Sequence, residues 1–394
     1  MKAGAALSAP RSLEAERVLD RHHQRANIER GQTIQVRVRE LNMNTYNLFI
    51  YIPFSLALFA ISAFATWIMT HWKIMDLPTH RSSHDQPVAK GGGVAIVVSF
   101  FLGYAALYGF GGAARIPEPY MAGFALAALA IAAVSLVDDI RKFSFAVKLA
   151  SQILATAVIL ASGLVLETLS FPYFGTLTLG WFGYPLTALW IIGLTNAFNF
   201  MDGLNGLAGG TAVIVALFFG IVTFLDGNAF VAALCFIILF STLGFLIFNF
   251  PQARVFMSDV GSQFLGFVFA VLAVIASQYE SAHTSFLVMP LLFFHFIYDT
   301  TLTFLRRLIH REKIAAAHRS HLYQLANRLG LSHVQVSLYH YLIAILQGLG
   351  ALWLIHLPPD RRALAFAPFL LFQCGYALVI LVRADRRGLL HLRR

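Results

Sequence analysis

The chain has 394 residues, of which 58% are hydrophobic and only 12% charged, and its mean hydropathy is +0.70. Soluble domains carry about 25% charged residues, so this composition excludes a single water-soluble core and predicts a membrane protein with several spans. The 29 Lys and Arg residues against 19 Asp and Glu give a net charge of +10. In a membrane protein such an excess collects in loops, so it does not indicate nucleic-acid binding.

The first 45 residues are polar and of mixed charge. No cleavable signal peptide is expected, because the apolar run that follows them is too long for one. We expect residues 1–45 to form a disordered extension that is either native or an artefact, with Met43 as the alternative start. Residues 46–383 are expected to form an integral membrane catalytic domain, and residues 384–394 a basic cytoplasmic tail.

Eleven apolar segments are long enough to cross a bilayer as helices, at about 20 residues each. A β-barrel is not expected, because the segments lack regular alternation of polar and apolar residues. The sequence therefore predicts an all-α polytopic membrane protein with about 11 transmembrane helices. The predicted spans lie near 46–72, 91–111, 120–138, 146–166, 181–199, 205–225, 229–250, 261–278, 285–305, 338–356 and 364–382.

Basic residues in the loops predict the orientation of these spans. The loops on the side of residues 73–90 hold 18 Lys and Arg residues, and the opposite loops hold three: Arg115, Arg361 and Arg362. The basic side is therefore predicted to be cytoplasmic. Eleven spans would place the N-terminal extension on the other side although it carries eight Lys and Arg residues, which conflicts with the positive-inside rule.

Three loop and turn features are predicted between the spans. Residues 168–179 alternate around a glycine, which is typical of a small periplasmic β-hairpin, with an irregular loop as the alternative. Residues 312–329, in the longest polar internal segment, are expected to form a short surface helix. Gly206 and Gly210 have the spacing of close helix packing.

Four acidic residues lie at the ends of predicted spans, all on the basic side. Asp138 and Asp139 end the third span, Asp202 follows the fifth and Asp259 precedes the eighth. Acids at membrane depth are costly and therefore indicate function. Carboxylate and amide oxygens suit Mg²⁺ or Mn²⁺, and Mg²⁺ is typically held by one or two carboxylates plus substrate phosphates. Basic residues nearby could neutralise phosphate oxygens: Arg81, Lys90, Lys148, His318, Arg319 and His321.

This pattern predicts a site for a metal and a diphosphate. Two alternatives stay open at this point: acids and bases that neutralise each other near the headgroups, and a proton or ion pathway through the membrane. Gly91-Gly92-Gly93, at the start of the second span, is expected to present backbone amides to an anion, with a flexible turn as the alternative. Glycine also adjoins acids at Gly203 and Gly261.

Five sequence blocks on the basic side carry a resemblance to a known family. They are Asp76-Leu77-Pro78 through Arg81-Ser82-Ser83-His84 to Gly91-Gly92-Gly93; Asp138-Asp139; Asn199-Phe200-Met201-Asp202-Gly203; Asn249 through Asp259-Val260-Gly261-Ser262; and His318-Arg319-Ser320-His321-Leu322-Tyr323-Gln324. In this order they resemble the polyprenyl-phosphate N-acetylhexosamine-1-phosphate transferases (glycosyltransferase family 4), and the similarity covers nearly everything after residue 45.

The resemblance implies transfer of a sugar-1-phosphate from a UDP-sugar to undecaprenyl phosphate, with release of UMP and with Mg²⁺ as cofactor. Mn²⁺ is the alternative cation. In such a reaction the protein mainly positions the partners and offsets charge. It also implies the bacterial inner membrane, with the active site facing the cytoplasm and the bilayer as a partner. Whether the chain forms a homodimer stays open.

Site residues follow from the resemblance by motif. Asp259 and Asn199 are expected to ligate Mg²⁺, and Asp138 and Asp139 to bind or deprotonate the lipid phosphate. Further residues are expected to act on the nucleotide sugar. Lys148 is expected to contact the diphosphate, and Asp202 to be a catalytic group. The remaining substrate contacts are expected from Asn205 and Phe256 on uracil, from His318, Arg319 and His321 on the diphosphate or sugar, and from Lys90, Asn196 and Asn249 as further substrate-binding residues.

Two positions depart from the family pattern. Asn205 stands where many bacterial members have Asp, so we expect it to recognise the base rather than a metal. Ser258 replaces the usual glycine of Phe-Met-Gly-Asp, where its hydroxyl is expected to narrow the turn or form a hydrogen bond. His318 and His321 would also suit Zn²⁺, but no further Cys or His lies nearby in sequence.

The Arg-Ser-Ser-His and His-x-x-His-Leu-Tyr-Gln forms resemble the O-antigen-initiating branch, whose donors carry N-acetylglucosamine or deoxy sugars such as N-acetylfucosamine and N-acetylquinovosamine. Two rival functions are disfavoured by the sequence. A CDP-alcohol phosphotransferase needs Asp-Gly-x-x-Ala-Arg, whereas Asp202-Gly203 continues differently. A transporter should show repeated halves with broken helices, and no such repeat is visible.

Overall fold

The computed structural model describes residues 52–72, 74–76, 87–110, 118–171, 175–278, 283–313 and 318–390. The predicted extension 1–45, its alternative start Met43 and the Arg81–His84 part of the first motif lie outside the described residues. The chain divides into the units Met1–Ser55 and Leu56–Arg394. Everything below concerns the second unit, apart from the first turn of the helix Ile52–Thr70.

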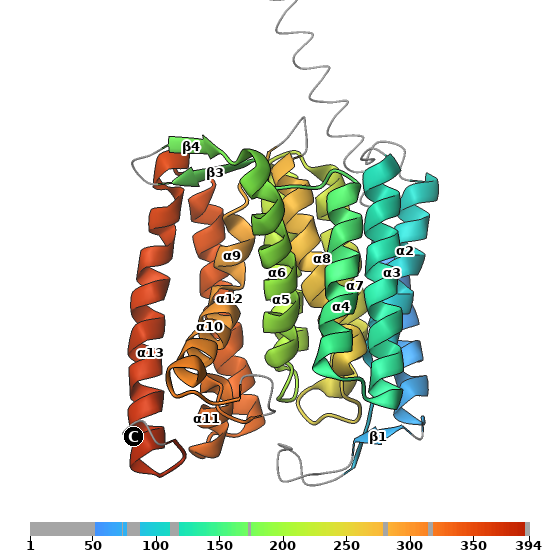
Figure 1. The fold of residues 1–394 in the computed structure, drawn as a ribbon. Helices are drawn as coiled ribbons and strands as arrows, with labels where there is room; N and C mark the ends of the chain where they lie inside the picture. Colours follow the sequence, from blue (N-terminus) through green and yellow to red (C-terminus); the bar gives the residue numbers. More distant parts are fainter. Residues whose placement is uncertain are drawn as a thin grey trace, which may run out of the picture. The chain divides into compact units, whose positions relative to one another are not determined.

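Helices dominate the second unit, and the long ones run side by side as a bundle (Figure 1). After the helix Ile52–Thr70 they are α2 (Gly93–Phe110), α3 (Glu118–Arg141), α4 (Phe145–Ala161), α5 (Gly183–Phe200), α6 (Leu207–Leu225), α7 (Ala229–Asn249), α8 (Ser258–Gln278), α9 (Val288–Leu292), α10 (Phe294–Ile309), α11 (Leu322–Arg328), α12 (His333–Leu354) and α13 (Ala367–Arg386). Two 3₁₀ segments, η1 (Gly180–Phe182) and η2 (Pro359–Phe366), precede α5 and α13.

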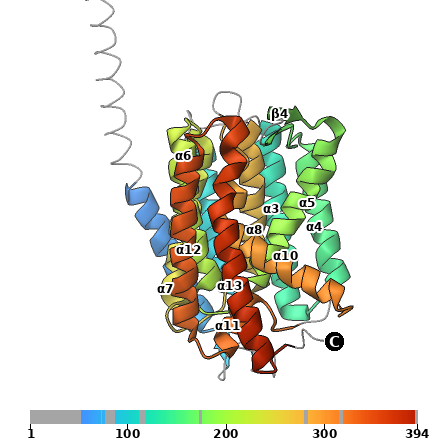
Figure 2. The same ribbon diagram turned by 90° about the vertical axis from the view of Figure 1, so that its left-hand side faces the viewer.

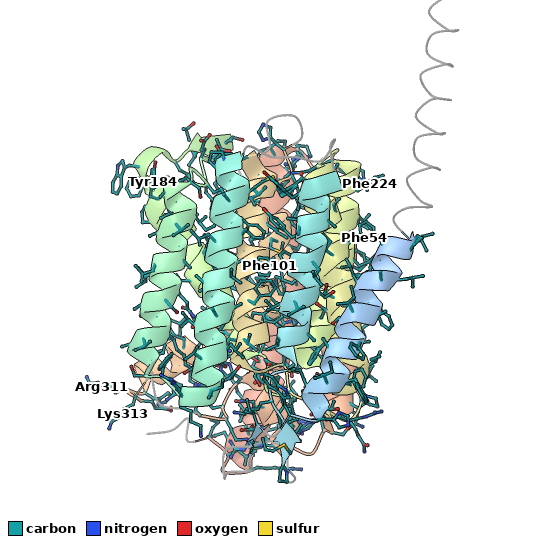
Figure 3. All side chains as sticks on the ribbon, turned by 90° about the vertical axis from the view of Figure 1, so that its right-hand side faces the viewer. Phe54, Phe101, Tyr184, Phe224, Arg311 and Lys313 are labelled. Atoms are coloured by element: carbon teal, nitrogen blue, oxygen red, sulfur yellow. The ribbon has the colours of Figure 1, made fainter. Side chains whose placement is uncertain are left out.

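The strands form two small hairpins at opposite ends of the bundle (Figure 1). At the end where α11 also lies, β1 (Met75–Asp76) pairs with β2 (Val88–Ala89). At the other, β3 (Thr168–Phe171) pairs antiparallel with β4 (Gly175–Thr178), where the sequence predicts a hairpin. We refer to the end that carries β1 and α11 as the α11 end. Arg311 and Lys313 also lie there, far from Tyr184 at the opposite end (Figure 3).

The described residues include seven helices that are long and apolar enough to cross a membrane. They are Ile52–Thr70, Pro119–Arg141, Leu207–Leu225, Ala229–Asn249, Ser258–Gln278, His333–Leu354 and Pro359–Arg386; Gly93–Gly109 and Phe145–Ala161 are shorter apolar helices. The chain is therefore a polytopic, mostly helical membrane protein, as predicted. The count of eleven spans and the side of the membrane on which β3 and β4 lie remain predictions.

α8 is the most enclosed of these helices. Its side chains from Val260 to Ala276 are all buried, including Phe264, Phe267 and Phe269. α3 and α5 pack against it. Because protein surrounds α8, a polar residue at its N-terminus is held by neighbours on several helices instead of facing lipid.

One predicted span is wrong as a single helix. Residues 285–305 divide at Phe293, where α9 ends and α10 sets off obliquely to α12 and α13 (Figure 2). The change of direction keeps His295 and Asp299 buried against protein, at 1% and 2% exposed. Polar side chains are costly in lipid.

The predicted surface helix 312–329 is also shorter than expected. α11 covers only Leu322–Arg328, residues 318–320 are not helical, and residues 314–317 lie outside the described part of the chain. The packing predicted for Gly206 and Gly210 is confirmed. A methyl group on Gly210 would lie 2.1 Å from the Tyr341 hydroxyl, so only glycine lets α6 approach α12 this closely.

Candidate active site at the N-terminus of α8

The backbone of β2 and of the glycines that follow it holds the segment that leads into α8 in place. Phe256 N donates to Ala89 O (2.8 Å), Gly92 N to Phe256 O (2.9 Å) and Gly93 N to Met257 O (3.0 Å). These bonds extend the pairing of β2 to the chain just before α8. They determine where the first turn of α8, and with it Asp259, begins.

The interpretation of Gly91-Gly92-Gly93 as an anion site is therefore wrong. All three amides donate within the protein, that of Gly91 to Ser258 Oγ at 3.2 Å. The glycines serve a close backbone crossing, because a methyl group on Gly93 would lie 2.3 Å from Gly261 N. Gly203 likewise makes room for Tyr323, whose hydroxyl would lie 2.2 Å from a methyl group there.

Ser258 occupies a backbone conformation that favours glycine. Its φ is 62°, in the left-handed region, and its hydroxyl accepts the hydrogen bond from Gly91 N. A non-glycine residue in this region costs about 1–3 kcal/mol. Serine in place of the usual glycine at position 258 thus introduces backbone strain, and it adds one hydrogen bond between the segment before α8 and the glycine segment before α2.

We expect Ser258→Gly to change the free energy of unfolding by less than about 1 kcal/mol, because relief of strain offsets a hydrogen bond worth about 1 kcal/mol. Both variants lose the bond, but Ser258→Ala keeps the backbone strain, so it should be less stable than Ser258→Gly by about 1 kcal/mol. Thermal unfolding of both variants in detergent checks the order. An Ala variant as stable as the Gly variant would contradict this account.

An ion cluster forms directly beside this turn. Lys148 Nζ, from α4, lies 2.5 Å from Asp138 Oδ2 at the end of α3 and 2.5 Å from Asp259 Oδ2 at the start of α8. Asp259 Oδ1 accepts from Asn199 Nδ2, near the end of α5, at 3.0 Å. Four helices thus bring together one ammonium, two carboxylates and one amide, all of them predicted from the sequence.

Asp139 has a different environment from Asp138. Its two carboxylate oxygens accept from the backbone N–H groups of Asp259 (3.2 Å) and Val260 (3.1 Å), so it caps the N-terminus of α8. A carboxylate at this place is favourable because the free N–H groups of a helix point at it. Asp138 instead accepts from Phe143 N at 2.5 Å and pairs with Lys148. The structure separates the two acids that the sequence treats as a pair.

Asp202, in the turn between α5 and α6, is a further acid of this region. Burial, followed by repulsion from Asp259 and Asp139, raises the pKa of its carboxyl to about 8, so it is mostly protonated at neutral pH. Lys148 is the ammonium group paired with Asp138 and Asp259, whereas Lys90 pairs with Asp76 at 3.0 Å. Two carboxylates on one ammonium favour a further cation.

The donor set fits Mg²⁺ in one specific way. Asn199 Nδ2 donates to Asp259 and to Ser262 Oγ, which leaves the amide oxygen of Asn199 as a potential ligand. No group of three His, Cys, Asp or Glu side chains among the described residues is arranged to hold a metal. A cation at Asp259 and Asn199 would thus need oxygens from a substrate, which is the usual mode of Mg²⁺ in phosphate sites.

Two residues predicted to bind substrate are occupied within the protein. Asn196 Nδ2 donates to Gln152 Oε1 (2.7 Å), and Gln152 in turn donates to Gln263 Oε1 (3.2 Å), which ties α4, α5 and α8 together. Asn249 is 4% exposed; its oxygen accepts from Gly206 N and its nitrogen donates to Val255 O, both at 2.8 Å. Their amides are paired internally, and their role in substrate binding stays a prediction.

The other predicted contacts lie at the same end and are more open. Phe256 and Asn205 are half-buried, and the Lys90 side chain is 22% exposed. The Asn205 amide donates to Pro251 O at 3.3 Å, and its backbone oxygen accepts from Ser337 Oγ at 2.7 Å. The first bond holds the turn after Asp202 against the loop that leads to Phe256, and the second joins the same turn to α12.

The histidine loop packs against the end of α5. The rings of His318 and His321 stack with their centroids 5.0 Å apart, and His321 also stacks on Phe200 at 5.9 Å. The Tyr323 hydroxyl donates to Phe200 O at 2.8 Å. The loop therefore joins the segment that carries Asn199 and Asp202, and Arg319 within it is half-buried.

Sequence reasoning missed Asp299 on α10. It is buried and accepts hydrogen bonds from His321 Nδ1 and from the backbone N–H groups of Leu322 and Tyr323. A lone acid within the apolar segment 285–305 is itself a signal of function, because it is costly in lipid. That signal was present in the sequence.

Comparison with known proteins gives consistent matches. The sequence model of the family described as Glycosyl transferase family 4 matches residues 121–277, which include Asp138, Lys148, Asn199 and Asp259. A probable undecaprenyl-phosphate N-acetylglucosaminyl 1-phosphate transferase from Bacillus subtilis (strain 168) is 33% identical over 280 residues, 71% of this chain and 76% of the relative.

Other relatives match over shorter stretches. A phospho-N-acetylmuramoyl-pentapeptide-transferase from Leuconostoc citreum (strain KM20) is 35% identical over 212 residues, 50% of this chain and 64% of the relative. A protein of the same name from Listeria innocua is 41% identical over 113 residues, 28% of this chain and 35% of the relative. Of these three relatives, the first is matched over the largest share of its length.

Proposed function

Because the chain belongs to glycosyl transferase family 4, the polyprenyl-phosphate sugar-1-phosphate transferases, we propose that it transfers N-acetylhexosamine-1-phosphate from a UDP-sugar to undecaprenyl phosphate. An oxygen of the lipid phosphate attacks the sugar-proximal phosphorus, the bond from that phosphorus to the bridging oxygen breaks, and UMP leaves. The Asp138–Lys148–Asp259 cluster, beside Asn199 at the N-terminus of α8, is the observation that carries this proposal.

The residues of the cluster have distinct proposed roles. Asp259 and the Asn199 oxygen would hold Mg²⁺, which supplies charge neutralisation of the diphosphate when bound. Lys148 donates to the diphosphate as a point charge. Asp138 orients Lys148 and the lipid phosphate, whereas Asp139 acts through the start of α8. A phosphomonoester is largely ionised at neutral pH, so little proton removal is required of these acids.

The nucleotide sugar would extend from the cluster across the α11 end. Phe256 stacks on uracil and Asn205 hydrogen-bonds its edge, while His318, Arg319 and His321 grip the diphosphate or the sugar. Asp202 and Lys90 border the same region, where Asp202 is a catalytic candidate because of its raised pKa. We place the α11 end in the cytoplasm of a bacterial inner membrane, because the basic loops lie there.

The donor proposed first is UDP-N-acetylglucosamine, because a relative that matches over most of its length is named for that sugar. UDP-linked deoxy derivatives, N-acetylfucosamine and N-acetylquinovosamine, are the alternatives that the Arg-Ser-Ser-His and His-x-x-His-Leu-Tyr-Gln forms suggest. The product would initiate O-antigen or another lipid-linked cell-envelope polysaccharide.

A donor panel tests the proposal. Purified protein in nanodiscs with undecaprenyl phosphate and Mg²⁺ is offered each UDP-sugar, and UMP release and the lipid product are measured with and without EDTA. We expect turnover with at least one N-acetylhexosamine donor and its loss in EDTA. No UMP from any donor, while a known relative works under the same conditions, would refute the proposed reaction.

Asn205→Ala is expected to raise the KM for the UDP-sugar about 10-fold and to change kcat by less than about 3-fold, because base contacts persist from ground state to transition state. Asn327→Ala is the matched control, since the Asn327 amide also donates to a backbone oxygen, that of Leu331. Its KM should equal that of the wild type. Steady-state kinetics of both variants measure KM and kcat. A loss confined to kcat in Asn205→Ala would contradict the proposed contact with uracil.

A further inference from the structure

Asp299 is a fully hydrogen-bonded carboxylate inside the protein. It lies on α10, is 2% exposed, and accepts from Leu322 N (2.9 Å) and Tyr323 N (3.2 Å). Thr303 Oγ1 (3.1 Å) and His321 Nδ1 (3.2 Å) donate to its Oδ1. Four donors match the acceptor capacity of an ionised carboxylate.

The contact with His321 determines which ring nitrogen carries hydrogen. A carboxylate only accepts, so His321 Nδ1 must be protonated to bond Asp299. The other ring nitrogen, Nε2, has no hydrogen-bond partner among the residues that the structure describes. The ring is also held by stacking on His318 (5.0 Å) and Tyr323 (5.9 Å), so its orientation is determined on every side.

Capping of α11 alone does not account for a charged group at this depth. Ser332 caps the next helix, α12, with a neutral hydroxyl that accepts from Gln335 N at 3.2 Å. A buried carboxylate costs several kcal/mol unless it is paired. The imidazole of His321 is the partner whose hydrogen bond is strengthened by the negative charge of Asp299.

We propose that Asp299 is a positioning residue that acts through His321. It holds His321 with Nδ1 protonated and presents Nε2 to a phosphate oxygen of the nucleotide sugar. It also stabilises the imidazolium when the ring carries a second proton next to the phosphate. Such carboxylate–histidine pairs set the tautomer and basicity of the ring. The inference rests on the proposed function, in which His321 contacts the diphosphate.

A double-mutant cycle separates this role from simple capping. Asp299→Asn and His321→Asn are each expected to lower kcat/KM about 10- to 100-fold. The double variant should be no worse than His321→Asn within about 3-fold, because Asp299 has then lost the group through which it acts. The loss of thermal stability from Asp299→Asn should be smaller, but not absent, in the His321→Asn background, because the contact with His321 is gone while the bonds from Leu322 N and Tyr323 N remain. Losses of kcat/KM that multiply would overturn the proposal.

Ser332→Ala is the matched control, because it removes a helix cap at the neighbouring helix only. It should lower thermal stability and leave kcat/KM within about 2-fold of the wild type, since a cap is worth about 1 kcal/mol of stability alone. A fall in kcat/KM as large as that of Asp299→Asn would show that loosening this region is enough, and would also overturn the proposal.

A second measurement on the wild type requires no enzymatic activity, and it uses a variant only to assign the signal. Nitrogen-15 spectra of histidine-labelled protein should show a neutral ring protonated at Nδ1 that disappears in His321→Asn. A ring protonated only at Nε2 would overturn the proposal. If the wild type releases no UMP with any donor, the proposed function fails, while this spectrum still decides whether Asp299 orients His321.

Discussion

Asp259→Ala should lower UMP release at least about 1,000-fold, equivalent to about 4 kcal/mol of transition-state stabilisation. The Asp259 carboxylate binds both Lys148 (2.5 Å) and Asn199 (3.0 Å), so its loss removes the proposed metal ligand and releases two of its neighbours. Single-turnover assays at saturating donor measure the chemical step. Isothermal titration with Mg²⁺ and UDP reports the expected loss of metal-dependent binding.

Asp226→Ala is the control for this variant. Asp226 follows the C-terminal end of α6, at the end of the bundle opposite the cluster, and it should keep turnover within about 3-fold of the wild type because it touches no part of the site. Equal and mild losses of turnover in Asp259→Ala and Asn205→Ala would contradict the proposal that Asp259 binds the metal and Asn205 recognises the base.

Lys148→Met should both inactivate the protein and make its stability depend on Mg²⁺. The lysine ammonium lies 2.5 Å from Asp138 and 2.5 Å from Asp259, with side chains 5% and 25% exposed. Removing one partner of a buried ion pair costs about 3–5 kcal/mol, and the partly open position of Lys148 lowers this to about 2 kcal/mol. Turnover should fall at least about 100-fold, because the diphosphate loses its lysine.

The response of stability to Mg²⁺ distinguishes loss of the Lys148 charge from a general disturbance of the fold. A divalent cation between the unpaired carboxylates would restore stability, so Mg²⁺ should raise the unfolding temperature of Lys148→Met more than that of the wild type. Lys142→Met, in the exposed turn after α3, removes the same charge outside the cluster and should respond to Mg²⁺ as the wild type does. An identical Mg²⁺ response in all three proteins would contradict the account.

Much of the architecture could be predicted because it depends on patterns along the chain. Apolar runs of about 20 residues indicate spans whatever their neighbours are. Asp138, Lys148, Asn199 and Asp259 could be predicted as a group because each lies at or near the same end of a span, where helix ends meet. The hairpin formed by β3 and β4 follows from local alternation around a glycine.

Hydrogen-bond partners could not be predicted in the same way. Whether the amides of Gly91 to Gly93 are free depends on residues 256–258, which lie more than 160 positions away in the chain. The same holds for Asn249, which binds a turn at Gly206, and for Asp299, three of whose four donors follow it by more than 20 residues. Sequence motifs identify such polar residues but not what they bind.

The sequence alone determined that this protein spans a membrane, that four acids at the ends of its spans gather at one end, and to which family its motifs belong. These properties follow from composition and spacing, which need no tertiary contacts. Only the tertiary structure decided that Asp138 pairs with Lys148 while Asp139 caps α8, and that Asp299 lies behind His321. Chemically identical carboxylates take different roles because packing decides which donors reach each one.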